Sequence, residues 1–122
     1  MIGSLMMRVG VVVLLVGMLA GIAMGVREDF ALQPVHAHLN LVGGVLLFLF
    51  GLYYRLTPAA AASALARIQG WLHIVGGIAF PIGVAIVILK GTTFIALPIL
   101  GSLIVVIAMA LFAVIVFRTS QV

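Results

Sequence analysis

The sequence contains no cysteine. Disulfides, thiolate zinc sites, iron–sulfur clusters, cysteine nucleophiles and the covalent thiol attachment of c-type heme are therefore excluded together. Charge is also scarce, because charged residues make up 7% of the 122 residues and only two of these residues are acidic. Both acidic residues, Glu28 and Asp29, lie next to each other in a predicted loop. The intramembrane carboxylate that would favour a small proton-driven exporter is therefore missing.

Apolar residues are correspondingly abundant, at 66% of the chain, whereas soluble domains are roughly half apolar. They form four runs, each near or above the length of about 20 residues that crosses the hydrocarbon core of a bilayer. The runs are Val9 to Val26, Phe30 to Tyr54, Ile68 to Leu89 and Thr92 to Phe117. We predict an all-α membrane protein with four transmembrane helices in an up-down-up-down path, forming a single domain over residues 1–122.

The basic residues are distributed unequally between the two ends of these helices. One end has four arginines, and the other has Arg27 and Lys90. The four are Arg8, Arg55, Arg67 and Arg118. The positive-inside rule then predicts a multi-pass protein of a bacterial-type inner membrane with both termini cytoplasmic. The basic residues are scattered singly, which argues against a nucleic-acid partner. A signal peptide is the alternative interpretation of the first run.

Glycines recur every four residues on one face of the first predicted helix, at Gly17, Gly21 and Gly25. This spacing lets helix backbones approach closely in lipid. The sequence does not say whether the partner helix belongs to the same protomer or to a neighbour.

Two of the three histidines, His36 and His38, lie at the outer end of the second predicted helix. Each could simply donate a hydrogen bond to a neighbouring carbonyl, but two histidines within three residues of a membrane helix favour ligation. Positions two apart on a helix point about 200° from each other, so these side chains cannot share one ion. We therefore expect each histidine to serve a different partner.

Asn40 follows His36 by one helical turn, and Gly43 and Gly44 continue near the same stripe. This pattern predicts an amide that orients the imidazole above a groove that suits a flat macrocycle. The alternative is that Asn40 bonds to a carbonyl and the glycines serve helix packing.

The third histidine, His73, is placed by its helix at the depth of Gly51, roughly 20 Å from the other two. We expect no metal there and interpret His73 as a hydrogen-bonded core residue or an interfacial one near Trp71. Met24 lies at the depth of His36 and His38 and offers a soft ligand, although methionine in an apolar helix usually serves packing.

The stretch from Val35 to Gly43 and the segment from Leu52 to Pro58 together resemble the histidine-bearing second helix of the catalytic subunits of heme-copper oxidases and nitric oxide reductases. They also resemble small four-helix proteins described as cytochrome oxidase-like. The resemblance implies twelve helices in three arcs of four, of which this chain would supply one. It further implies a low-spin heme between histidines on the second helices of two arcs, with His36 and His38 matching an H-x-H that faces two pores.

Together these features predict a membrane-embedded b-type cytochrome that carries electrons through non-covalent heme b. The chain lacks residues matching the copper-binding histidines and the tyrosine of the oxygen-reducing centre, so electron transfer is favoured over reduction of oxygen or nitric oxide, and catalytic residues are unknown. A quinol or another redox protein would be the partner. Arg27 or Lys90 would balance the heme propionates. The alternatives are a heme-free structural or accessory subunit and a copper-binding membrane protein.

Because His36 and His38 point in opposite directions, one protomer cannot clamp a heme by itself. In a twofold dimer a His36–His36 heme would leave both His38 side chains unpaired. In a ring, His36 of one protomer meets His38 of the next, and three protomers reproduce the twelve-helix plan that the resemblance implies. The paired residues then differ in height by about 3 Å, which modest helix tilt absorbs. The sequence therefore predicts a homotrimer with shared axial ligands.

Overall fold

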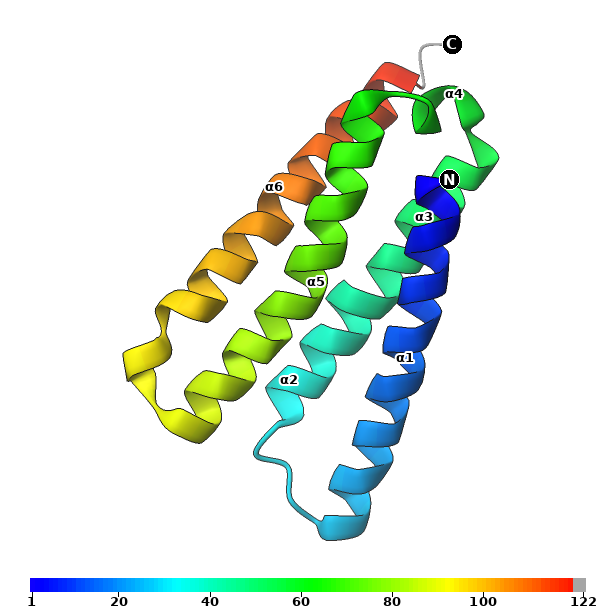
Figure 1. The fold of residues 1–122 in the computed structure, drawn as a ribbon. Helices are drawn as coiled ribbons and strands as arrows, with labels where there is room; N and C mark the ends of the chain where they lie inside the picture. Colours follow the sequence, from blue (N-terminus) through cyan, green and yellow to red (C-terminus); the bar gives the residue numbers. More distant parts are fainter. Residues whose placement is uncertain (120–122) are drawn as a thin grey trace.

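The computed structural model describes residues 1–119, and this part of the chain is helical with short connections (Figure 1). Four helical segments are long and apolar enough to cross a membrane, which confirms the predicted all-α fold with four candidate spans. They are α1 (Ile2–Arg27), the continuous α2, η1 and α3 (Gln33–His38, Leu39–Val45 and Leu46–Leu56), α5 (Ala64–Lys90), and η2 with α6 (Thr92–Phe94 and Ala96–Thr119). The short α4 (Pro58–Ala61) connects α3 to α5.

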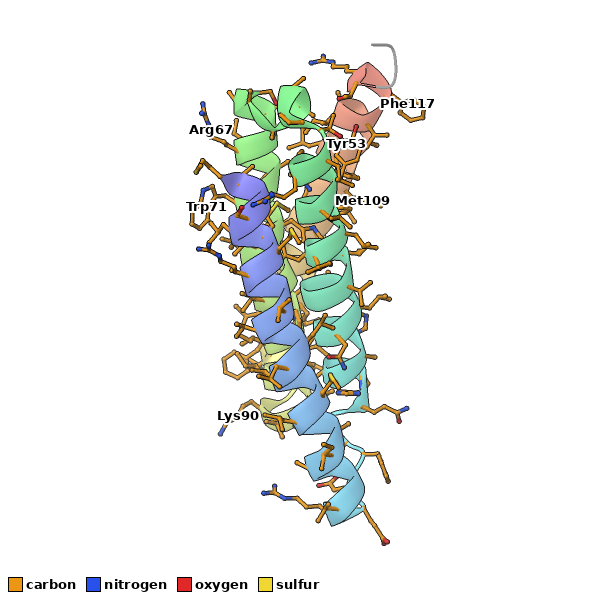
Figure 2. All side chains as sticks on the ribbon, turned by 90° about the vertical axis from the view of Figure 1, so that its right-hand side faces the viewer. Tyr53, Arg67, Trp71, Lys90, Met109 and Phe117 are labelled. Atoms are coloured by element: carbon orange, nitrogen blue, oxygen red, sulfur yellow. The ribbon has the colours of Figure 1, made fainter. Side chains whose placement is uncertain are left out.

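The long segments lie side by side as a row in which each packs mainly on its neighbours, in the order α1, α2–α3, α5 and α6 (Figure 1). In a view turned by 90°, α1 lies in front of α5, and the α2–α3 segment lies beside α1 (Figure 2). Large apolar side chains point outward along both outer helices, for example Leu15, Leu19 and Ile22 on α1 and Leu103 and Val106 on α6. This exposed apolar surface suits contact with lipid, as expected for a multi-pass membrane protein.

Local chemistry sets where the helices begin and end. Glu28 ends α1 in the left-handed conformation with a φ of 51°, and Gly91 ends α5 with a φ of 106°. Ser63 begins α5 by accepting a hydrogen bond from the Ala66 N–H, so α5 starts four residues before the apolar run that begins at Ile68. The first helix likewise starts at Ile2 and not at Val9, because helices continue past the hydrocarbon core into polar surroundings.

The glycines of α1 form its contact with the second helical segment of the same chain. Cβ atoms added at Gly3, Gly17 and Gly21 would meet atoms of α3, η1 or α2 at distances that real Cβ atoms do not show, and one at Gly10 would meet the Phe48 backbone nitrogen at a tight 3.0 Å. Gly25 differs, because nothing lies within 4 Å of its added Cβ. The structure therefore assigns Gly17 and Gly21 to packing within the protomer, whereas Gly25 is free of that role.

A buried polar chain joins α3, α5 and α6. The Tyr54 hydroxyl donates to Gln69 Oε1 at 2.8 Å, and Gln69 Nε2 donates to the Ala108 carbonyl at 3.2 Å. Gln69 is fully buried, and the Tyr54 ring packs edge-on against Phe112 of α6. The sequence did not reveal this series of buried hydrogen bonds, because a single glutamine inside an apolar run does not indicate its partner.

Replacing Tyr54 with phenylalanine is expected to lower the free energy of unfolding by about 1–3 kcal/mol, because it leaves the buried Gln69 Oε1 without a donor. Adding Gln69→Leu to Tyr54→Phe should recover part of that loss, since both partners are then apolar. Denaturant unfolding in detergent measures both values. A double variant that is no more stable than the Tyr54→Phe single variant would contradict this account.

Candidate functional site

His38 lies at the end of α2, half-buried against α5, where its ring meets Phe80 edge-on with the ring centroids 4.9 Å apart. Its Nδ1 lies 2.6 Å from the carbonyl oxygen of Pro34, one turn earlier. A carbonyl only accepts hydrogen bonds, so Nδ1 carries a proton, and in the neutral ring Nε2 has the free lone pair. This is the tautomer that binds a metal through Nε2, held by the kind of backbone bond that usually orients metal-ligating histidines.

His36 leaves the helix toward α1, on the side opposite to His38. Its ring lies directly over Gly21, where an added Cβ would come within 2.8 Å of the His36 Cε1. The H-x-H therefore places one imidazole against each neighbouring helix, as the 200° offset predicts. Within the protomer the two histidines do not face a common point.

Asn40 is in contact with His36, with its Nδ2 at 3.2 Å from Nδ1 and 3.3 Å from Nε2 of the ring. Asn40 Oδ1 points to Gly17 instead, buried and without a hydrogen-bond partner. An amide nitrogen donates, whereas an iron-bound imidazole needs an acceptor for its second N–H. Turning the amide around would direct Oδ1 to that N–H and give this orphaned oxygen the donor that it lacks. The residues thus fit an orienting role for Asn40 after this rotation.

A pocket of about 240 Å³ opens beside His36 at the end of α1. Apolar side chains line most of it, including Leu39 and Met24, and Arg27 and Asp29 lie on its wall. Typical small-molecule pockets have roughly 300–1,000 Å³, so this one is too small to enclose a macrocycle without a second surface. The structure brings together His36 and Arg27, two of the residues that the sequence singled out. Met24 joins them in the pocket.

The predicted groove at Gly43 and Gly44 is filled in the structure. A Cβ at Gly43 would lie 2.7 Å from the carbonyl oxygen of Gly77 on α5, and one at Gly44 would lie 2.6 Å from the Leu14 side chain on α1. Both glycines are buried. The structure therefore favours the packing alternative for Gly43 and Gly44 over an open surface for a macrocycle.

His73 is fully buried, and its Nε2 donates to the Val42 carbonyl at 2.8 Å while its ring packs edge-on on Phe50. Val42 lies in η1, a π-helical segment in which the Leu46 N–H bonds to the Leu41 carbonyl, five residues back. The bond places His73 beside Val42, which is nearer to His38 along the second helical segment than the expected depth of Gly51. Wide π turns leave carbonyl oxygens available to side chains. The sequence did not reveal the π turn at η1.

Lys90 is exposed at the end of α5 (Figure 2), and it does not line the pocket beside His36 to which Arg27 contributes. Among residues 1–119 no group of three or more histidine or carboxylate side chains is arranged to hold a metal ion. A copper site built by one protomer has no support in this part of the chain.

No family model matches this sequence, and comparisons with curated proteins and with solved structures find no matching chain. The resemblance to heme-copper oxidase subunits therefore stays a prediction from the H-x-H segment.

Proposed function

We propose that this chain is a membrane-embedded b-type cytochrome whose protomers form a trimer and bind heme b between His36 of one protomer and His38 of the next. The observation that carries the proposal is the 2.6 Å contact from His38 Nδ1 to the Pro34 carbonyl, because it leaves Nε2 ready to bind iron in a chain that offers no thiolate. The opposite orientation of His36, over Gly21, supports ligands shared between protomers.

Heme held by two histidines would supply a one-electron carrier, with no open iron position for oxygen. The chain's own residues have defined roles in this proposal. His38 and His36 donate ring nitrogens, Asn40 orients His36, and Arg27 at the mouth of the pocket balances propionate charge. Gly43 and Gly44 are omitted, because neighbouring helices fill the space beside them. The arginine-rich end with both termini faces the cytoplasm of an inner membrane, and a quinol or a redox protein supplies the electron.

A heme-free accessory subunit is the second candidate, because the bonds of His38 to Pro34 and of His73 to Val42 each engage one ring nitrogen within the protomer without any cofactor. Absorption spectra of protein expressed with excess heme separate the two. The cytochrome requires a Soret band and an alpha band that appears with dithionite. A protein with neither band would reject the cytochrome, and metal analysis of the same sample would identify bound copper.

Arg27→Gln is expected to weaken heme binding by about threefold and to lower the midpoint potential, because an exposed cation that favours the reduced state is lost. Lys90→Gln removes the same charge outside the pocket and serves as the matched control. Heme titration and redox potentiometry of both variants provide the measurement. Equal effects of the two substitutions would indicate a general surface-charge effect and contradict a specific role for Arg27.

A further inference from the structure

The end of the molecule where α1 begins has an unbalanced positive charge. Two arginines lie on α1 and α3, at Arg8 and Arg55, and Arg67 lies on the first turn of α5 (Figure 2). The two carboxylate side chains of the protein, Glu28 and Asp29, follow the opposite end of α1. From Arg8 to Glu28 the helix rises about 30 Å at 1.5 Å per residue, far beyond the screening length of roughly 8 Å. These arginines therefore have no acidic side chain nearby to neutralise them.

Two adjacent hollows meet at Arg55. The first, of about 440 Å³, lies between α1 and α3 and includes Arg8 in its wall. The second, of about 450 Å³, extends to Arg67 on α5. Arg55 and Ser4 line both hollows, and Arg55 Nη1 donates to Ser4 Oγ at 2.6 Å. This bond holds the guanidinium between the hollows and leaves four of its five N–H groups for another acceptor.

The hollow between α1 and α3 is also apolar on its walls. Met7, Leu52 and Leu56 line it beside the two arginines, and Leu56 is 75% exposed. The outward apolar face of α1 continues from there toward the middle of the span. A ligand that matches both features has an anionic headgroup and a long apolar chain. Trp71, exposed one turn after Arg67 on the same side of α5, is typical of the membrane interface at which such headgroups lie (Figure 2).

We propose that this end of the protein binds one anionic phospholipid, of the phosphatidylglycerol class, in the two hollows that share Arg55. The phosphodiester lies against the guanidinium groups of Arg55, Arg8 and Arg67, and an acyl chain follows Met7, Leu52 and Leu56. Basic pockets between membrane helices recognise anionic headgroups in this way, and arginine suits phosphate because its donors are arranged as a planar fork. The site is separate from the histidines at the other end of α2 and does not depend on heme.

Native mass spectrometry of the delipidated full-length protein tests this proposal. Dioleoyl phosphatidylglycerol is titrated in detergent, with dioleoyl phosphatidylethanolamine and glycerol 3-phosphate as parallel arms. We expect one tightly bound phosphatidylglycerol per chain and much weaker binding in both other arms, because one headgroup has no net charge and the other compound has no acyl chain. Equal affinity for phosphatidylethanolamine would reject the charge-selective site. Equal affinity for glycerol 3-phosphate would reject the lipid in favour of a free phosphate ester.

Arg55→Gln is expected to weaken phosphatidylglycerol binding by about tenfold or more, because it removes charge-assisted hydrogen bonds to the phosphodiester. Arg118→Gln is the matched control, since Arg118 lies at the same end but lines neither hollow. Arg67→Gln leaves the Arg55–Ser4 bond intact and should give a smaller loss, which keeps the test valid if the Arg55 variant folds poorly. Unchanged binding in both the Arg55 and Arg67 variants, or an equal loss in the Arg118 variant, would overturn the proposal.

Discussion

Replacing His38 with alanine is expected to affect every heme in the protein. Each heme is either lost or converted to a five-coordinate form. In the proposed ring each heme takes His36 from one protomer and His38 from the next, so a substitution at either position removes one axial ligand from all sites. The loss of heme affinity should exceed the 10- to 100-fold that is typical when only a supporting residue of a metal site is changed. His36→Ala should have the same effect for the same reason.

Stoichiometry and mass distinguish the ring from a dimer. The ring requires one heme per chain and a detergent-corrected mass of three chains, whereas a His36–His36 dimer would have one heme per two chains. The absorption spectrum, a heme assay and light scattering of the same samples provide these values. A His38→Ala protein that retains fully six-coordinate heme, or a mass of two chains, would contradict the shared-ligand trimer.

His73→Ala serves as the histidine control for these experiments. His73 donates to the Val42 carbonyl and is fully buried, so its loss should lower stability without removing an iron ligand. We expect the heme content of folded His73→Ala protein to match that of the unsubstituted protein. Loss of half or more of the heme from folded protein would indicate a second binding site at His73.

Gly43→Ala is expected to lower the free energy of unfolding by about 2–3 kcal/mol, because the added methyl group would lie 2.7 Å from the backbone oxygen of Gly77. A backbone atom cannot rotate away as a side chain can, so η1 and α5 must separate. That separation also strains the neighbouring bond from His73 to Val42. Chemical unfolding in detergent, followed by helical circular dichroism, gives the size of the effect.

Two other glycines provide graded controls for this substitution. A Cβ at Gly77 would lie 3.2 Å from the Gly43 Cα, so Gly77→Ala should cost less than Gly43→Ala. Gly25 has open space around it, so Gly25→Ala should be neutral or stabilising by about 0.5–1 kcal/mol through higher helix propensity. Similar stabilities for the Gly43→Ala and Gly25→Ala proteins would show that the two helices are not held together by this close approach.

The sequence by itself determined the features that depend only on composition and helical period. Apolar runs long enough to cross a bilayer predicted the four candidate spans, because exposed polar backbone is not tolerated in hydrocarbon. The absence of cysteine excluded thiolate ligands and left histidine as the main candidate metal ligand. The spacing of His36 and His38 predicted opposite orientations, since 100° per residue is a property of any α-helix. The candidate ligands, but not the surfaces around them, could therefore be found without coordinates.

Only the tertiary structure decided which helix lies against each residue. It paired Gly17 with Asn40 and Gly21 with His36, closed the expected groove at Gly43 with Gly77, and placed His73 on the Val42 carbonyl. Helical period says which residues share a face, but the contact made by that face depends on the partner's position and axial register. The axial register of α5 against η1 is visible in the bond from His73 to the Val42 carbonyl. The start of α5 follows from the local Ser63 cap, whereas the pairing of His73 with Val42 depends on segments distant in the chain, which no local sequence pattern records.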